Sequence, residues 1–128
     1  MDLGSGLPFI AEGALVRGTA VMAGTAYPQV KPTTGANVKV LGYALCAAAD
    51  GQEVSIHPVT AGNAKCKAIA SATIARGDSL ISSATTGALK SIAASSTLKY
   101  GAGMALEAAI TGQLFDILPA FFESAVTT

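Results

Sequence analysis

The strongest constraint on this chain of 128 residues is a stretch of seventeen residues that occurs twice. Residues 42–58 read G-Y-A-L-C-A-A-A-D-G-Q-E-V-S-I-H-P, and residues 103–119 read G-M-A-L-E-A-A-I-T-G-Q-L-F-D-I-L-P. Nine positions are identical, whereas composition alone gives roughly one or two matches, so the stretches indicate an internal repeat. The chain therefore duplicates a piece of scaffold and no chemistry. The identical pairs are Gly42/Gly103, Ala44/Ala105, Leu45/Leu106, Ala47/Ala108, Ala48/Ala109, Gly51/Gly112, Gln52/Gln113, Ile56/Ile117 and Pro58/Pro119.

Each copy of the repeat predicts a β-hairpin. In the first copy, residues 37–48 alternate in polarity and Asp50-Gly51 is a sequence typical of hairpin turns. Residues 52–57 then return, and Pro58 ends the strand. A short helix over residues 43–49 is the alternative, because alanine favours helices, but the segment is brief and runs between glycines.

Alternation along the two strands predicts which face is buried. The opposite face carries Cys46 and Ser55 in one copy and Glu107 and Asp116 in the other. A face that accepts carboxylates in these positions is expected to be at least partly solvated. The predicted core positions are Tyr43/Met104, Leu45/Leu106, Ala47/Ala108, Val54/Phe115 and Ile56/Ile117.

The repeat is predicted to extend beyond the hairpin into two related halves. Arg17-Gly18 precedes the first G-x-A-L motif by 25 residues, and Arg76-Gly77 precedes the second by 27. The expected half-repeats cover about 14–58 and 73–119. Further strands are expected over 14–22, 64–70, 79–82 and 89–92.

Many short strands with frequent turns predict a mainly β fold, a small β-barrel or sandwich with an internal pseudo-repeat and little helix. We expect one barrel domain over residues 14–119. Residues 1–13 are predicted to form an irregular N-terminal arm, because two early glycines and Pro8 interrupt them, and residues 120–128 are predicted to form a C-terminal tail.

Charge is scarce and balanced in this sequence. Eight basic and eight acidic residues make 12% of the chain, about half the usual share of roughly 25%. We expect no nucleic-acid partner, because binding to phosphate backbones needs clustered Lys and Arg. We also expect no membrane partner, since no apolar run approaches the length of a bilayer span. No signal peptide is expected either, because the N-terminus has no basic region followed by an apolar one. A surface with few ions docks onto proteins at little desolvation cost, which hints at an assembled protein.

Two short motifs match known functional sequences. Gly77-Asp78-Ser79-Leu80 matches the nucleophile block of the G-D-S-L hydrolases, but the single histidine, His57, precedes the serine and the D-x-x-H element is missing. Arg76-Gly77-Asp78 spells an integrin-binding tripeptide, which is too short to be specific. We expect a turn that leads into a strand, and no enzyme.

No metal site or cofactor is predicted. His57 has no Cys, Asp or Glu at ligand spacing, and the acidic residues are scattered singly. Cys46 and Cys66 lack the pattern of a zinc site or of a disulfide framework, so we expect two buried free thiols.

The order of the segments resembles a known family. After G-Y-A-L come A-K-C-K-A, A-R-G-D-S-L-I-S, T-G-A-L-K and G-M-A-L-E-A-A, followed by a second Gly-Gln turn and L-F-D-I-L. Over about residues 14–118 this order resembles the tailed-bacteriophage capsid cement (decoration) proteins. The marks are Gly77-Asp78 before an apolar strand, Thr86-Gly87 in the next turn, and Gly103-x-Ala105-Leu106 with Gly112.

The resemblance implies a β-tulip-like, non-enzymatic protein on the outer capsid surface of a virion, made in the cytoplasm of a host bacterium. Its implied partners are the major capsid protein, whose assembled lattice it would stabilise, and further copies of itself. Many such proteins are homotrimers and some are dimers. A copy that binds only the assembled lattice stabilises it by mass action, and an oligomer gains avidity.

Apolar residues in the arm and the tail are the predicted contacts with the capsid or a neighbouring protomer: Leu7, Pro8, Phe9, Ile10, Phe121 and Phe122. The alternative is that they cover the chain's own barrel. Two other functions stay open at this point: an adhesion or glycan-binding module that uses residues 76–78 or a barrel mouth, and a small hydrolase centred on Ser79.

Overall fold

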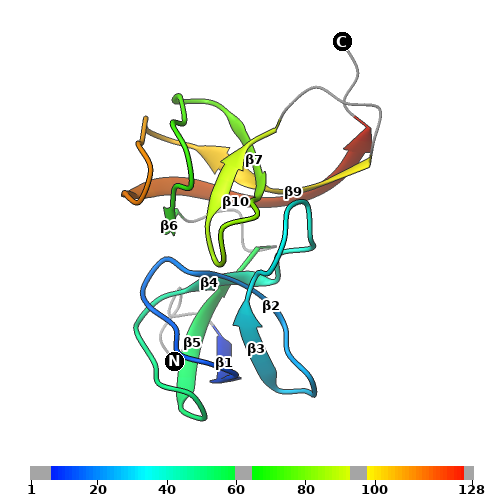
Figure 1. Cartoon of the computed structure of the whole chain (residues 1–128), viewed down its shortest axis with the longest axis vertical. Coiled ribbons are helices and arrows are strands. Elements are labelled where there is room, and N and C mark those ends of the chain that lie inside the picture. Colours follow the sequence, from blue (N-terminus) through cyan, green and yellow to red (C-terminus); the bar gives the residue numbers. More distant parts are fainter. Residues whose placement is uncertain (1–6, 60–64, 93–97, 126–128) are drawn as a thin grey trace.

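The protein consists of two β-rich units stacked along its long axis (Figure 1). The computed structural model describes residues 7–59, 65–92 and 98–125, and in these ranges it contains ten strands and no helix, hence no helix that could cross a membrane. The first unit consists of β1 (Leu7–Ala11), β2 (Ala20–Ala23), β3 (Gln29–Pro32), β4 (Gly42–Ala44) and β5 (Glu53–Pro58). The second consists of β6 (Cys66–Ile69), β7 (Ser79–Ser82), β8 (Leu89–Ser91), β9 (Leu98–Ala105) and β10 (Leu114–Ala125).

The two units have the same strand order. The first is a closed barrel in the order β1-β3-β2-β4-β5, in which β1 pairs parallel with β3 and antiparallel with β5. The second is a sheet in the order β6-β10-β9-β7-β8, whose two edges are joined by a parallel bridge between Ala70 and Leu89. This bridge corresponds to the Ala11–Val30 pair of the first unit. We therefore call the units barrel 1 and barrel 2.

Strand register confirms the predicted internal repeat and its hairpin. In barrel 1, Gly42 pairs with Pro58 and Ala44 with Ile56. In barrel 2, the residues of the second copy pair in the same way, Gly103 with Pro119 and Ala105 with Ile117. The mainly β fold is thus confirmed, and the alternative helix over residues 43–49 is not formed.

The segment expected to be an irregular arm is ordered in its second part. Residues 7–11 form β1, which closes barrel 1 and corresponds to β6 of barrel 2. Long-range pairing with β5 overrides the local signal of Pro8, which lies in register with Ser55. Residues 120–125 of the expected tail continue β10 beyond a bulge between Pro119 and Phe122. Residues 1–6 and 126–128 lie outside the described ranges.

Several predicted strands are shorter than expected, two of them markedly. The strand expected over 14–22 begins at Ala20, and the one expected over 37–48 covers only residues 42–44. The remainder forms turns that an isolated antiparallel bridge between Leu15 and Ala48 holds together. The same bridge recurs between Ile74 and Ala109.

The bend after β4 also changes which residues are buried. Of the predicted core positions, Tyr43, Val54, Ile56, Phe115 and Ile117 are buried. Ala47 and Ala108 are exposed and Leu45 and Leu106 half-buried, because the chain leaves the strand after Ala44 and Ala105 and the alternation is lost. Instead the neighbouring Ala48 and Ala109 enter the core. Met104 was also predicted to be buried but is 39% exposed.

The glycine at the start of both copies has a steric cause. A Cβ at Gly42 would clash with the His57 carbonyl oxygen and with Ile56, and a Cβ at Gly103 would lie 2.9 Å from the Leu118 carbonyl oxygen. Neighbouring strands therefore approach more closely here than any other residue allows. This contact explains why the repeat begins with glycine.

Candidate functional site

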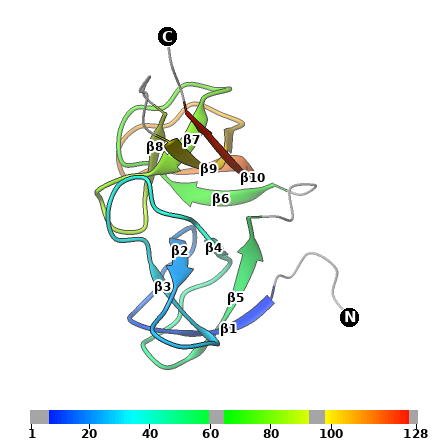
Figure 2. The same cartoon turned by 90° about the vertical axis from the view of Figure 1, so that its right-hand side faces the viewer.

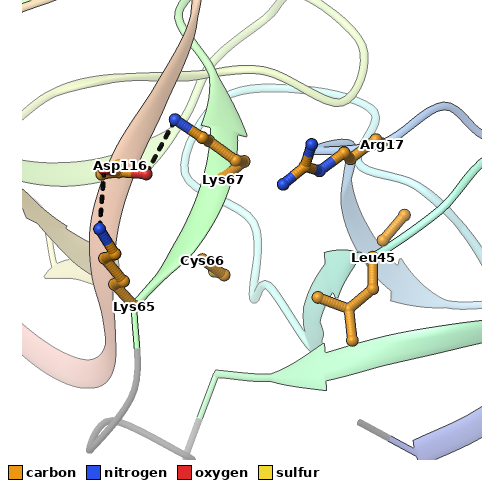
Figure 3. Close-up of a pocket in the computed structure, with 7 residues that line it drawn as sticks. Arg17, Leu45, Lys65, Cys66, Lys67 and Asp116 are labelled. Atoms are coloured by element: carbon orange, nitrogen blue, oxygen red, sulfur yellow. Dashed lines mark hydrogen bonds and ion pairs between the residues drawn. The ribbon is translucent and has the colours of Figure 1, made fainter. Parts of the chain in front are cut away.

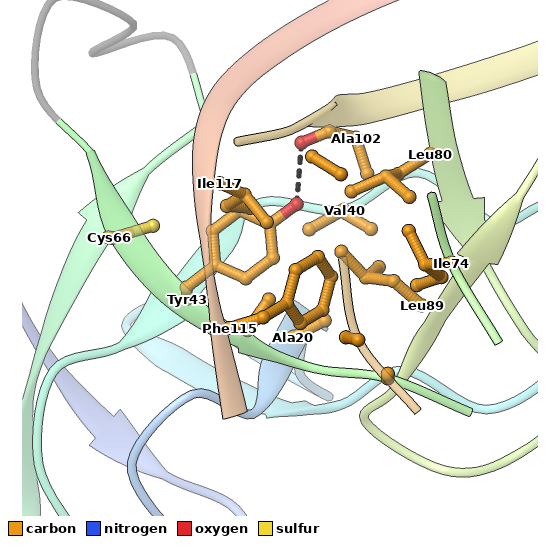
Figure 4. Packing of buried hydrophobic residues seen from close by; sticks show 14 of the residues in the cluster. Ala20, Val40, Tyr43, Cys66, Ile74, Leu80, Leu89, Ala102, Phe115 and Ile117 are labelled. Atoms are coloured by element: carbon orange, nitrogen blue, oxygen red, sulfur yellow. Dashed lines mark hydrogen bonds between the residues drawn. The ribbon is translucent and has the colours of Figure 1, made fainter. Parts of the chain in front are cut away.

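The junction between the barrels is organised around Tyr43. Tyr43 lies on β4, is fully buried, and belongs to a core cluster made mostly of barrel 2 residues. Figure 4 shows its ring beside Phe115 and Ile117, with the hydroxyl group directed at Ala102. The hydroxyl donates a hydrogen bond of 2.5 Å to the Ala102 carbonyl oxygen, and burial raises the pKa of Tyr43 well above its ordinary value. The phenol of Tyr43 thus stays protonated, and its hydroxyl group, the only polar group that this side chain brings into barrel 2, is hydrogen-bonded.

Small residues in barrel 2 make room for this ring. By strand register Ala68 corresponds to Phe9 of barrel 1, since they face Phe115 and Val54, respectively. Ala102 corresponds to Leu41, one residue before the repeat glycine. Phe9 and Leu41 pack against the core of their own barrel and are partly buried. At these positions barrel 1 is therefore filled by its own side chains, whereas barrel 2 receives a side chain from barrel 1.

Hydrogen bonds fasten the rim of the junction. The Asn37 N–H donates to the Ser82 carbonyl oxygen at 3.1 Å, and the Val38 N–H donates to Ser82 Oγ at 2.8 Å. The Tyr100 N–H donates to Asn37 Oδ1 at 2.8 Å, and the Lys39 ammonium lies 5.2 Å from the centre of the Tyr100 ring. A cation at this distance from an aromatic face is attracted to it. These contacts fix the two barrels relative to each other.

A pocket of about 300 Å³ opens beside the junction (Figure 3). The Asp116 carboxylate on β10 forms ion pairs with Lys67 Nζ at 2.9 Å and with Lys65 Nζ at 3.3 Å. The hydrogen bond from Lys67 and, more weakly, that from Lys65 hold the pKa of Asp116 below its ordinary value. Both barrels contribute to the lining: Arg17, Ala44, Leu45, Lys65, Cys66, Lys67 and Asp116.

The two cysteines differ in environment. Cys66 is buried in the pocket wall, and burial, reinforced by Asp116, raises its pKa to about 12, so the thiol is protonated and unreactive. Cys46 is exposed, and its predicted burial is wrong. It follows Leu45 in the bend after β4, where the alternation of the strand no longer applies. Both thiols are free.

The catalytic residues that a hydrolase would need are not brought together. Ser79 is exposed at the start of β7 in barrel 2, whereas His57 is buried in β5 of barrel 1 with Nδ1 3.1 Å from the Pro58 carbonyl oxygen. Asp78 accepts hydrogen bonds from the Ala75 N–H at 2.9 Å and from Ser91 Oγ at 2.6 Å. Its carboxylate therefore closes the turn of the Arg-Gly-Asp tripeptide. Over the described ranges no three potential metal ligands cluster.

The predicted contact residues lie at two places. Pro8 on β1 is exposed, and Phe9 and Ile10 are half-buried. Phe9 packs against the core of barrel 1, as the alternative interpretation expected, although part of its surface stays accessible. Leu7 lies in β1 and Phe121 and Phe122 lie in β10, but their side chains are outside the described part of the structure.

Sequence reasoning missed the junction. It placed Tyr43 in an ordinary core and gave Arg17 only a role in the repeat. One signal was present, because the pair Tyr43/Met104 joins the largest side chain of the first copy to an unlike residue in the second. The difference between Phe9 and its counterpart Ala68 could have been predicted only if the first half-repeat had been extended back to residue 7.

Comparison with known proteins gives a fold relationship. No known family profile matches the sequence, and no curated protein matches it. Among solved structures, the chain is similar to the N-terminal base of the head fiber protein gp8.5 of bacteriophage phi29. The similarity covers 89% of this chain and 92% of that chain, with a TM-score of 0.67 and 19% sequence identity. The stacked arrangement of both barrels is therefore a fold that this chain shares, over almost its whole length, with the base of a phage head fiber.

Proposed function

We propose that this chain is a structural protein of a bacteriophage head. The observation that carries the proposal is the likeness to the phi29 head fiber base over 89% of the chain. The segment order that resembles capsid cement proteins supports the same setting independently. Both lines concern proteins of phage heads, and neither depends on the other.

In finer detail, the protein binds the outer surface of the assembled major-capsid lattice in the virion and stabilises the head as a cement or decoration protein. It acts without catalysis and as a homo-oligomer, with a trimer as the favoured state. Its low charge supports this function: charged residues make up only 12% of the chain, so a large interface would have few ions to desolvate. The buried, hydrogen-bonded junction around Tyr43 suits a protein that must transmit load between two contact surfaces.

The contact with the capsid or a protomer is assigned to the β1 end of barrel 1 and to the far end of β10, where the predicted residues Leu7, Pro8, Phe9, Ile10, Phe121 and Phe122 lie. Figure 2 shows β1 at the end of the molecule opposite the C-terminal part of β10. A protein with two contact regions at opposite ends can bridge two neighbours. Because β1 closes barrel 1, removal of residues 1–12 would unfold the barrel and cannot test the contact.

Binding to heads that lack this chain tests the function directly. We expect the protein to co-sediment saturably with expanded heads and not with unassembled capsid subunits, and to raise the temperature at which the heads release DNA. Pro8→Asp should weaken binding, whereas Ile110→Asp, at a 65% exposed site of barrel 2, should not. Absence of binding to heads would contradict the proposal, and labelling of Ser79 by a fluorophosphonate would contradict the claim that the protein has no catalytic role.

A further inference from the structure

Three of the eight basic side chains of the protein line the pocket at the junction. Arg17 comes from the turn before β2 in barrel 1, and Lys65 and Lys67 come from the segment that begins barrel 2. Figure 3 shows the Arg17 guanidinium facing the wall that carries the two lysines. A chain without net charge thus collects positive charge at one place where its two halves meet.

The acidic groups nearby do not balance these three cations. Lys65 and Lys67 share one carboxylate, that of Asp116, at 3.3 and 2.9 Å. Glu107 lies 3.9 Å from Lys67, but it is directed at the backbone and accepts a hydrogen bond from the Asp116 N–H at 2.8 Å. Arg17 has no ion-pair partner among residues 7–59, 65–92 and 98–125. The pocket therefore keeps an excess of positive charge even when Glu107 is counted.

We infer that this pocket is a binding site for an oxyanion group, a carboxylate or a phosphate. Arg17 supplies a planar fork of N–H donors that matches two oxygens of such a group. Lys65 and Lys67, whose ammonium groups are bound to Asp116, add positive charge to the wall that Arg17 faces. A volume of about 300 Å³ is enough for a single charged group with a short stem. The half-buried Leu45 forms an apolar side of the pocket, against which such a stem can pack.

The repeat supplies a matched control for this site. Arg76 corresponds to Arg17, since each is followed by a glycine whose N–H donates to the carbonyl oxygen of an equivalent alanine. These bonds are Gly77 to Ala105 at 2.8 Å and Gly18 to Ala44 at 2.9 Å. The described part of the chain contains no third barrel that could place lysines opposite Arg76. Arg76 therefore lies in the same kind of turn as Arg17 but does not line an equivalent pocket. If anion binding depends on the stacking of the barrels, substitution of Arg17 must abolish or weaken it, and substitution of Arg76 must leave it unchanged.

Titrations of the purified full-length protein test the inference. Sodium phosphate and sodium acetate are added at constant ionic strength, and amide NMR spectra are followed for the wild type, Arg17→Gln and Arg76→Gln. We expect saturable shifts at the amides of Arg17, Leu45 and Lys67 in the wild type and in Arg76→Gln. In Arg17→Gln the affinity should fall roughly tenfold, because a charge-assisted bidentate contact is lost. The dispersion of the spectra shows at the same time that each variant is folded.

The two anions distinguish the source of the group. Saturation by acetate in preference to phosphate indicates an acidic side chain of a partner protein, and the opposite preference indicates free phosphate or a phosphorylated group. The partner case rests on the proposed function, so binding of Arg17→Gln to heads is measured as well. Failure of every variant to bind heads would count against the proposed function alone. No saturable shift with either anion, or equal affinity in Arg17→Gln and the wild type, would overturn the oxyanion site.

Discussion

Barrel 1 and barrel 2 have the same strand order and the same hairpin register, yet their mouths are closed in opposite ways. Barrel 1 uses its own Phe9 and Leu41, whereas barrel 2 has alanines at these positions and takes Tyr43 from its neighbour. The counterpart of Tyr43 on barrel 2 is Met104, which is 39% exposed. Duplication of a scaffold therefore does not by itself join the copies. A few substitutions between large and small side chains at equivalent positions create the junction between the barrels.

These exchanges also decide whether the contact at the junction could be repeated at the outer faces of the two described barrels. A heterologous contact, in which different surfaces of two similar bodies meet, can in principle continue without limit. We call Tyr43 the plug, and the part of barrel 2 around Ala68 and Ala102 that receives it the socket. In barrel 1 the position equivalent to the socket is filled by Phe9, and in barrel 2 the position equivalent to the plug carries Met104 instead of an aromatic ring. Neither described barrel therefore offers a second contact of the kind that forms the junction.

The largest effect is expected from removal of the plug. Tyr43→Ala should lower the free energy of unfolding by about 3–5 kcal/mol, because it leaves a ring-sized cavity between Phe115 and Ile117. Urea denaturation followed by circular dichroism measures this change. The matched control is Met104→Ala at the equivalent position of barrel 2, for which a loss of about 0.5 kcal/mol or less is expected. Equal losses in the two variants would refute the difference between the barrels.

A second effect is expected when the socket is filled as in barrel 1. Ala68→Phe adds a ring to the buried cluster that contains Tyr43, and we expect a loss of about 1–3 kcal/mol from overpacking of a fully buried site. The urea midpoint reports this loss. The control is Ala72→Phe, an exposed alanine in the same barrel, which should leave the midpoint unchanged. A stable Ala68→Phe variant would show that the socket was not full.

A smaller effect is expected from the hydroxyl group of the plug alone. Tyr43→Phe leaves the Ala102 carbonyl oxygen without its donor and should cost about 1 kcal/mol. The shape of the ring is kept, so the crystal structure of the variant should show the same junction. A cost as large as that of Tyr43→Ala would indicate that the hydrogen bond, and not the packing, holds the barrels together.

The smallest effect concerns the pocket and depends on pH. The pKa of Asp116 is lower in the folded protein, so its ion pairs with Lys65 and Lys67 stabilise the fold above the ordinary carboxyl pKa of about 3.9. This contribution is lost as the pH falls through the lower, folded-state pKa. Asp116→Asn should therefore melt slightly below the wild type at pH 7, and the two melting temperatures should converge in acid. A difference between the two melting temperatures that stays constant as the pH falls below the ordinary carboxyl pKa would contradict the assignment.

Local signals in the sequence predicted the repeated elements. The glycine, proline and Asp-Gly positions of the hairpin reflect constraints within a few residues, such as the close approach at Gly42, and they appear in the observed register. The strand over residues 79–82 was predicted with its observed limits for the same reason.

Long-range contacts explain what could not be predicted. β1 is stabilised by pairing with a strand more than forty residues away, so Pro8 and the nearby glycines gave a misleading local signal. The junction depends on which strand faces which barrel, and no spacing along the chain encodes that arrangement. Arg17 and Lys67 are fifty residues apart and line one pocket only because the barrels stack. Composition predicted the scarcity of charge but not its collection at one place.

The most direct test of the account is the stability of the double variant Tyr43→Ala/Ala68→Phe. If the introduced phenylalanine ring takes the place of the missing plug, as Phe9 does in barrel 1, the double variant should be roughly 2 kcal/mol more stable than the sum of the single changes allows. Urea unfolding of the four proteins of this cycle measures the coupling. Additive losses would contradict the claim that one ring from the neighbouring barrel fills the socket that barrel 2 leaves open.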